Sequence, residues 1–150
     1  MRFKRRRVNE SKPNEKSLHG NLQENIDEVK SGLGNSSDIM IRELYIHKDH
    51  QQKAGILYTD GLVDSEALRD LLNALSVFTS SNGSVSQDSI RQNIVEVLKY
   101  ESLSAGNIEY IHYMNDLSSS VLKGSTVILI DGHTTGLSVS TEGGEKTSSY

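Results

Sequence analysis

The stretch Gly55-Ile56-Leu57-Tyr58-Thr59-Asp60-Gly61-Leu62-Val63-Asp64 decides how this chain folds. Its first four residues predict a central strand covered on both faces, because a continuous apolar run bounded by turn residues is typical of such strands. Asp60-Gly61 then predicts a sharp turn, since glycine adopts positive φ angles at little steric cost. Asp64 or Ser65 is placed to cap the helix that follows.

A second stretch, Thr126-Val127-Ile128-Leu129-Ile130-Asp131-Gly132-His133, repeats this arrangement of an apolar strand that ends at Asp-Gly. In α/β proteins, ligands usually bind beyond the carboxyl ends of the strands. Two such ends in one small domain predict a shared mouth, and the alternative is that both are ordinary turns. The candidate ligand-binding residues are Asp60, Gly61, Asp131, Gly132 and His133.

Apolar spacing elsewhere predicts four helices, which begin at Ser17, at Asp64 or Ser65, at about Ser86 and at Asn107. Gly34 is placed to cap the first helix at its carboxyl end. The predicted strands are 39–46, 55–58, 126–131 and 136–140, and residues 132–135 join the last two as a hairpin.

The order of these elements predicts the fold class. Three helices lie between the second and third strands, which favours a parallel crossover, whereas the short connections on either side favour antiparallel pairs. We therefore expect an α/β fold with a small mixed β-sheet of about four strands, packed with about four helices.

Composition limits the class of protein. The 150 residues suffice for one domain, which we place at 17–142, between a disordered basic tail at 1–16 and a frayed end at 143–150. The chain has no cysteine, so disulfides and thiolate chemistry are excluded. No apolar run approaches the length of a membrane span, and the basic start is not followed by the apolar stretch of a signal peptide.

Charge is unevenly distributed. The net charge is -4, and five of the 16 basic residues precede the first acidic one, which leaves 11 basic against 20 acidic residues from position 8 onward. Such an acidic body argues against a nucleic-acid-binding domain. The basic tail itself can attract anionic lipid, contact RNA or stay solvated.

Signatures of catalysis and cofactor binding are absent from the sequence. It contains no phosphate-binding loop, dinucleotide fingerprint, zinc-protease motif or nucleophile elbow. His47, Asp49 and His50 are metal-ligand types in one loop without a fourth ligand, and a solvated loop is the better interpretation. His133 beside Asp131 is too common a spacing to indicate an acid–base pair. We expect no enzyme activity, no catalytic residue, no metal and no cofactor.

Three segments, in this order and spacing, resemble the N-terminal soluble domain of the A subunits of GerA-type spore germinant receptors. They are Leu33-Gly34-Asn35-Ser36-Ser37-Asp38-Ile39-Met40-Ile41-Arg42-Glu43, Leu57-Tyr58-Thr59-Asp60-Gly61-Leu62-Val63-Asp64 and Leu122-Lys123-Gly124-Ser125-Thr126-Val127-Ile128-Leu129-Ile130-Asp131-Gly132. The resemblance covers roughly residues 17 to 142.

The resemblance implies a non-catalytic part of an A subunit that senses a small polar nutrient, such as an amino acid or a sugar, and so triggers spore germination. It implies the first lobe of a two-lobed, binding-protein-like domain, with ligand in the cleft between this lobe and a missing second lobe. The implied partners are the receptor B and C subunits and, through a missing C-terminal region, the spore inner membrane, with this domain on the cytoplasmic side. The alternative function is an assembly module that docks the other subunits without contacting nutrient.

Overall fold

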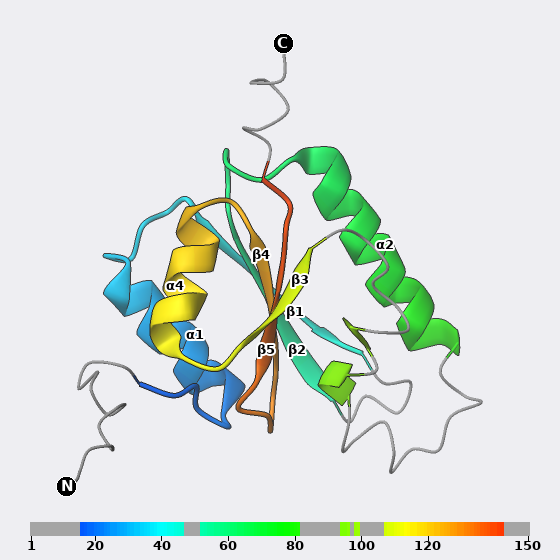
Figure 1. The fold of residues 1–150 in the computed structure, drawn as a ribbon, viewed down its shortest axis with the longest axis horizontal. Coiled ribbons are helices and arrows are strands. Elements are labelled where there is room, and N and C mark those ends of the chain that lie inside the picture. Colours follow the sequence, from blue (N-terminus) through cyan, green and yellow to red (C-terminus); the bar gives the residue numbers. More distant parts are fainter. Residues whose placement is uncertain (1–15, 47–51, 82–93, 97, 100–106, 143–150) are drawn as a thin grey trace, which may run out of the picture.

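The structure of the protein is a computed structural model that describes residues 16–46, 52–81, 94–96, 98–99 and 107–142. A five-stranded sheet forms its central layer, with helices α1 and α4 on one face and helix α2 on the other (Figure 1). This three-layer arrangement confirms the predicted α/β class. No helix within the described ranges is long and apolar enough to cross a membrane.

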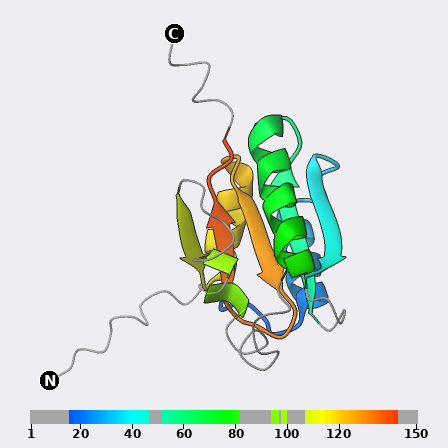
Figure 2. The same cartoon turned by 90° about the vertical axis from the view of Figure 1, so that its right-hand side faces the viewer.

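The strands are β1 (Ile39–Tyr45), β2 (Lys53–Thr59), β3 (Ile108–Ile111), β4 (Thr126–Ile130) and β5 (Gly136–Val139). Their order across the sheet is β1-β2-β4-β5-β3, and every neighbouring pair is antiparallel. Figure 2 shows this sheet from the side of α2, with β1 and β3 at its two edges. The expected hairpin is confirmed, because β4 and β5 pair directly through the turn at 131–135.

The predicted mixed sheet is wrong in one respect, since no neighbouring strands are parallel; the sheet has five strands where about four were expected. The additional strand lies where the fourth helix was predicted to begin. Residues 108–111 form β3, and helix α4 (Met114–Leu122) begins only after it. The crossover through α4 links β3 to β4, which run parallel because both are antiparallel to β5. β5 lies between these two parallel strands in the sheet. The other neighbour of β4 is β2, and that pair is antiparallel.

The first helix, α1 (Leu22–Gly32), begins later than the predicted start at Ser17. Hydrogen bonds of the preceding residues set this start. Asn21 caps it, accepting a hydrogen bond from the Glu24 backbone N–H at 2.9 Å. The preceding residues are extended, and Leu18 N donates to His112 O at 3.0 Å, which buries the Leu18 side chain without helical structure. At the other end Gly34 has a φ of 74°, as its predicted capping role requires.

Helix α2 (Ser65–Ser81) is capped by Asp64, whose Oδ2 accepts from the Ala67 N–H at 2.9 Å. On its inner face Leu71 and Leu75 are buried, and Leu68 and Leu72 are partly buried beside them. The predicted third helix lies mostly outside the described residues; of those described, 94–96 are α-helical and 98–99 are π-helical.

The two faces of the sheet bury separate apolar clusters, because side chains alternate along each strand. Ile56, Ile128 and Ile130 pack with α2, whereas Leu57, Val127 and Leu129 pack with α1 and α4. All five residues of β4 are buried, and so are six of the seven in β2. The prediction of central strands covered on both faces is therefore confirmed for both.

Several expectations lie outside the described residues. These are the disordered tail up to residue 15, the loop that holds His47, Asp49 and His50, and the frayed end at 143–150.

We predict that Gly136→Ala will destabilise the fold by about 1–3 kcal/mol, because a β-carbon there would lie 2.8 Å from Leu129 Cδ2 and 3.0 Å from Ile128 O. Gly55→Ala is the matched control, since its β-carbon would meet only side-chain atoms, the nearest being Leu22 Cδ1 at 3.1 Å. Urea unfolding of the two variants measures both costs. Equal losses of stability for Gly136→Ala and Gly55→Ala would contradict the view that the close backbone contact at Gly136 excludes a larger residue there.

Candidate functional site

The two Asp-Gly turns lie at opposite ends of the sheet, so the structure does not bring the five candidate ligand-binding residues together. β2 and β4 pair antiparallel with Ala54 opposite Ile130, which places Asp131 beside Lys53. Asp60 follows the other end of β2, roughly 20 Å away along the strand at about 3.4 Å per residue. The expectation of one mouth is therefore wrong, because it depended on parallel strands whose carboxyl ends meet at the same edge.

Asp131 is bound within the fold. Its Oδ1 accepts the N–H of Leu22, the first residue of α1, at 2.8 Å. Its backbone N donates to Lys53 O at 2.9 Å, and its backbone O accepts from Gln52 Nε2 at 2.6 Å. A carboxylate at a helix N-terminus satisfies a free N–H and interacts favourably with the positive end of the helix dipole. Asp131 thus joins α1 to the end of the central strands.

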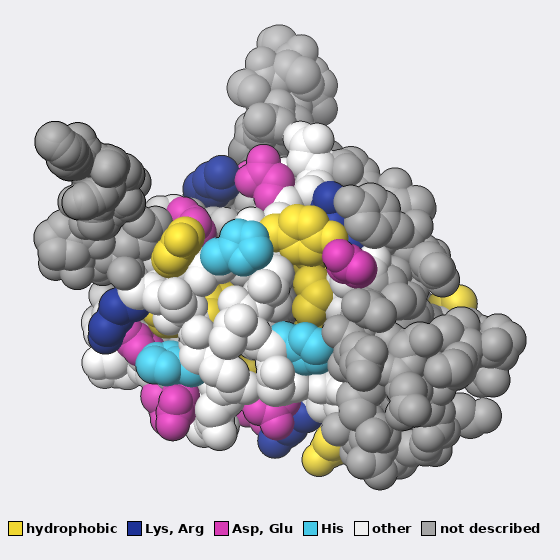
Figure 3. All heavy atoms as spheres, turned by 60° about the horizontal axis from the view of Figure 1, so that its bottom comes forward, with side chains coloured by type: hydrophobic (Ala, Val, Ile, Leu, Met, Phe, Trp, Pro, Cys, Tyr) yellow, Lys and Arg dark blue, Asp and Glu magenta, His cyan; other side chains and the backbone are white. Residues whose placement is uncertain are grey.

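The neighbouring Gly132 and His133 complete this turn. Gly132 has the predicted positive φ, at 91°, and its N–H donates to Gly20 O at 2.7 Å. His133 N donates to Ile130 O at 3.1 Å, and its side chain is half-buried. Figure 3 shows this end of the molecule, where histidine and acidic side chains are scattered among neutral ones. Among the described residues, no group of three His, Asp or Glu side chains is placed to hold a metal ion.

Asp60-Gly61 forms the turn at the other end of the sheet, where the side chains of Asp60 and Leu62 face solvent. Gly61 has a φ of 95°, and Asp60 N donates to Asp38 O at 2.7 Å. Asp60 itself is exposed, as is Leu62, which retains 43% of its accessible surface. This turn therefore presents one carboxylate and one apolar side chain at the surface.

The last turn of α4 lies against the same end. Thr59, just before the turn, donates its buried hydroxyl to Val121 O at 2.7 Å. Leu122, which ends α4, is 54% exposed. A helix C-terminus carries partial negative charge, so it and the Asp60 carboxylate together favour a cationic group. Lys123, at the C-cap of α4, is the cationic side chain nearest in sequence to this terminus.

The described part of the chain also ends here. Val63 forms an isolated antiparallel bridge with Glu142, and Asp64 N donates to Thr141 O at 2.7 Å. Gly124, beyond α4, lies so close to this bridge that an added β-carbon would be 3.1 Å from both Leu62 O and Glu142 Cγ. Thr141 and Glu142 are thus held beside the Asp60 turn.

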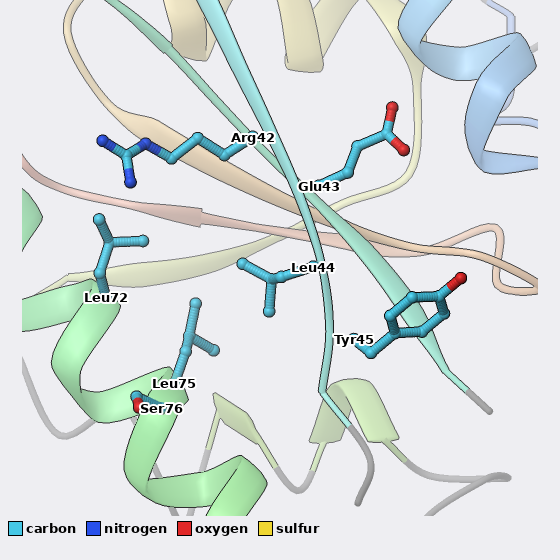
Figure 4. A pocket seen from close by; sticks show the side chains of 7 residues that line it. All are labelled: Arg42, Glu43, Leu44, Tyr45, Leu72, Leu75 and Ser76. Atoms are coloured by element: carbon cyan, nitrogen blue, oxygen red, sulfur yellow. The ribbon is translucent and has the colours of Figure 1, made fainter. Parts of the chain in front are cut away.

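A surface hollow of about 620 Å³ lies elsewhere, between edge strand β1 and helix α2. Figure 4 shows Leu44 pointing from β1 toward Leu72 and Leu75 of α2, with Arg42 on the same side of the strand. Tyr45 and Glu43 point to the other side of β1. None of the residues predicted for ligand binding lines this hollow.

Three aromatic rings, those of Tyr110, His112 and Tyr113, lie on and just after β3. The rings of Tyr110 and His112 are 6.2 Å apart, and those of His112 and Tyr113 are 6.5 Å apart. The Lys99 ammonium lies 4.7 Å from the centre of the Tyr110 ring. These contacts belong to the exposed end of an edge strand.

The segment before α1 is fastened to that helix by charged groups. Glu28 accepts from Lys16 Nζ at 2.8 Å, and its other carboxylate oxygen lies 2.7 Å from His19 Nε2. The hydrogen bond from Lys16, followed by that from His19, holds the pKa of Glu28 below its ordinary value of 4.5. Asn25 adds a paired contact, accepting from His19 N at 2.8 Å and donating to His19 O at 2.9 Å.

Sequence reasoning missed these fastening contacts. The Asn21-x-x-Glu24 pattern was available as a helix-start signal and would have placed the start of α1 correctly. No local pattern marks Thr59 as a donor to α4, since Val121 is 62 residues away in sequence. Asn25 bonds to His19 only six residues away, but no common motif predicts that pair.

Comparison with known proteins agrees with this fold. The sequence model described as "Bacillus/Clostridium GerA spore germination protein" matches residues 27–149. The chain is 30% identical over 129 residues to spore germination protein KA of Bacillus subtilis strain 168, which covers 85% of this chain and 22% of that protein.

A crystal structure of the N-terminal domain of the A subunit of the Bacillus megaterium spore germinant receptor GerK3 also matches. It has a TM-score of 0.65 and 33% identity, over 87% of this chain and 50% of that one. The fold is thus that of half of a germinant receptor A-subunit N-terminal domain. The chain belongs to the GerA family of spore germination proteins, and it spans about a fifth of the length of its curated relative.

We predict that Asp131→Ala will lower the free energy of unfolding by about 0.5–2 kcal/mol, because the N–H of Leu22 loses its acceptor. Asp131→Asn keeps an acceptor oxygen and should retain most of the stability. Asp60→Ala should change stability by no more than about 0.5 kcal/mol, since its side chain is exposed. Thermal and urea unfolding measure all three; a cost at Asp60 as large as at Asp131 would contradict these assignments.

We predict that Glu28 contributes to stability in a pH-dependent way. Its pKa is lowered on folding, so the contribution is fully present above the ordinary pKa of 4.5 and is lost as pH falls through the folded value. Glu28→Gln should therefore cost about 0.2–1 kcal/mol near pH 6, since the side chain is 29% exposed, and less near pH 3.

Urea unfolding of both proteins between pH 3 and pH 6 provides the test. Lys16→Met removes the larger cause of the pKa shift and is the control, because in that background the Glu28→Gln effect should depend less on pH. An effect of Glu28→Gln that is constant over this range would contradict the assignment.

Proposed function

We propose that this chain is a non-catalytic, nutrient-sensing part of a germinant receptor A subunit, with its ligand-facing surface at the Asp60 turn. The observation that carries the proposal is the exit of the chain beside that turn, through the Val63–Glu142 bridge. The related GerK3 domain is about twice as long as the part matched here, and a second lobe that followed residue 142 would begin next to Asp60.

The chemistry of this end suits a small polar nutrient that carries an ammonium group or hydroxyls. The Asp60 carboxylate is exposed, the C-terminus of α4 adds partial negative charge, and the exposed Leu62 and Leu122 supply apolar surface. Ligand sites commonly combine apolar walls with a few polar groups that fix orientation. Gly61 allows the tight turn that presents them.

The remaining candidates take a supporting role in this proposal. Asp131 and Gly132 bond to the start of α1 and to the segment before it, so they position the helix and do not contact nutrient. His133 belongs to the same turn. The whole receptor subunit acts at the spore inner membrane with B and C subunits, and this domain lies on the cytoplasmic side.

The second candidate function is assembly, in which this end docks another subunit and not a nutrient. The exposure of Leu62 and Leu122 at this end favours it, because exposed apolar surface can mark contact surfaces between proteins. The two functions differ in whether a variant at this end alters the nutrient response or the amount of receptor.

We predict that Asp60→Asn in the full-length receptor will raise the nutrient concentration for half-maximal germination roughly tenfold, because a hydrogen bond to a charged group is lost. The measurement is germination of spores that depend on this receptor, with receptor content determined by immunoblot of spore membranes. Asp27→Asn, an exposed carboxylate on α1 that accepts from Gln23, is the matched control and should leave the response unchanged.

An unaltered nutrient response at normal receptor content would rule out Asp60 as a ligand contact. A fall in membrane-bound receptor for Asp60→Asn, but not for Asp27→Asn, would favour the assembly function.

A further inference from the structure

The outer edge of β1 is a regular template for strand addition. β1 pairs with β2 over all seven of its residues without a bulge, and it is the last strand on its side of the sheet. Figure 2 shows no other described element beyond it. It has none of the shortening, proline or bulge by which many proteins protect such edges.

Hydrogen bonds at the two ends of the β1–β2 pair show which backbone groups face outward. Ile46 N donates to Gln52 O at 2.9 Å, and Asp60 N donates to Asp38 O at 2.7 Å. Antiparallel pairing alternates, so the even-numbered residues of β1 bond to β2 and the odd-numbered ones direct their N–H and C=O groups away. Within the described residues, no backbone group bonds to the outward side of Ile41 or Glu43.

Side chains beside this edge can distinguish between partners. On the α2 face, Arg42 lies two residues from Leu44, and Leu44 borders the hollow of about 620 Å³ with Leu72 and Leu75 (Figure 4). On the opposite face, Glu43 accepts from Lys53 Nζ at 2.9 Å. Arg42 donates from Nε to the Tyr58 hydroxyl at 3.3 Å, and no carboxylate of a described residue lies within 4.0 Å of it.

A second copy of this chain fits the edge poorly. Two β1 strands related by a two-fold axis perpendicular to the sheet must pair outward-facing residues with each other. Centring the pair on Arg42 or on Glu43 sets like charges directly opposite, which is destabilising. Centring it on Ile41 sets Arg42 opposite Met40, where no charge is matched. Centring it on Met40 sets Arg42 opposite Asp38, but Asp38 lies in the turn before β1, where Ile39 N donates to Ser36 O, so this register lacks a strand to pair with Arg42. Charge and backbone together therefore favour a partner of different sequence.

We propose that the outer edge of β1 binds an extended segment of another protein as an added antiparallel strand, at Ile41 and Glu43. Read from its N-terminus, the segment carries an apolar, a basic and an acidic residue in succession. The apolar residue lies opposite Leu44 and enters the hollow, the basic one lies opposite Glu43, and the acidic one lies opposite Arg42. Backbone bonds supply affinity, and the alternating side chains supply specificity.

The first experiment titrates the isotope-labelled chain with the peptide Thr-Leu-Lys-Glu-Val-Thr-Thr and follows backbone amide signals by NMR. The matched control, Thr-Leu-Glu-Lys-Val-Thr-Thr, has the same composition with its two charges exchanged. We expect the largest changes at the Ile41 and Glu43 amides, and binding of the control about fivefold weaker, since two cross-strand charge pairs are reversed.

Variants of the chain test the assignment of each contact. The double variant Arg42→Glu with Glu43→Lys should reverse the preference between the two peptides, and Arg42→Gln should reduce it. Ile41→Pro removes one outward N–H and should weaken both peptides equally, while an edge strand tolerates the proline. Dispersion of the NMR spectrum confirms that each variant is folded.

Three results would overturn the proposal. The first is a lack of change at the β1 amides with millimolar peptide, and the second is a preference that does not reverse in the double variant. The third is sedimentation of the chain alone as a dimer in which the Ile41 and Glu43 amides are protected, because a second copy would then occupy the edge.

Discussion

The antiparallel pairing of β2 with β4 is the constraint on which the rest of the structure depends. Both strands are buried on both faces, so a one-residue slip of either would exchange the two apolar clusters between the faces of the sheet. Gly55 lets α1 approach β2 closely, with the Leu22 and Ile26 side chains over it. The positions of α1, α2 and α4 all follow from the register of this pair.

The same pairing separates the chemistry of the two ends. At one end Asp131 satisfies an N–H of α1, and hydrogen bonds from Lys16, His19 and Gly132 tie the preceding segment to the fold. At the other end Asp60 is exposed beside the C-terminus of α4 and the exit of the chain. One aspartate therefore stabilises a helix, whereas the other is available to a ligand or a partner.

The edge of the sheet offers a different kind of surface from its ends. The Asp60 end presents a carboxylate and scattered apolar side chains, which suit a compact ligand or a packed lobe. The β1 edge presents backbone groups in a repeating order, with Arg42 and Glu43 on opposite faces. The proposed nutrient contact and the proposed strand addition therefore use separate surfaces of the domain.

Local sequence determined most of the individual elements. The apolar runs at 55–58 and 126–130 specified buried strands, and both Asp-Gly pairs specified turns at positive φ. Asp64 was correctly placed as a helix cap. The three segments that resemble GerA-type receptors were sufficient to indicate the family, because they combine these turns and strands in one order.

Only the tertiary structure decided whether neighbouring strands run parallel or antiparallel, and hence where the two Asp-Gly turns lie. Residues 108–111 have apolar spacing that suits either a helix or a strand, and only pairing with β5 makes them β3. That added strand reverses the direction of β4 relative to β2 and moves Asp131 away from Asp60. Sequence thus determined which residues turn and which are buried, since those properties depend on near neighbours. The spatial relation of the two aspartates depended on pairing between segments about 70 residues apart, which no local pattern encodes.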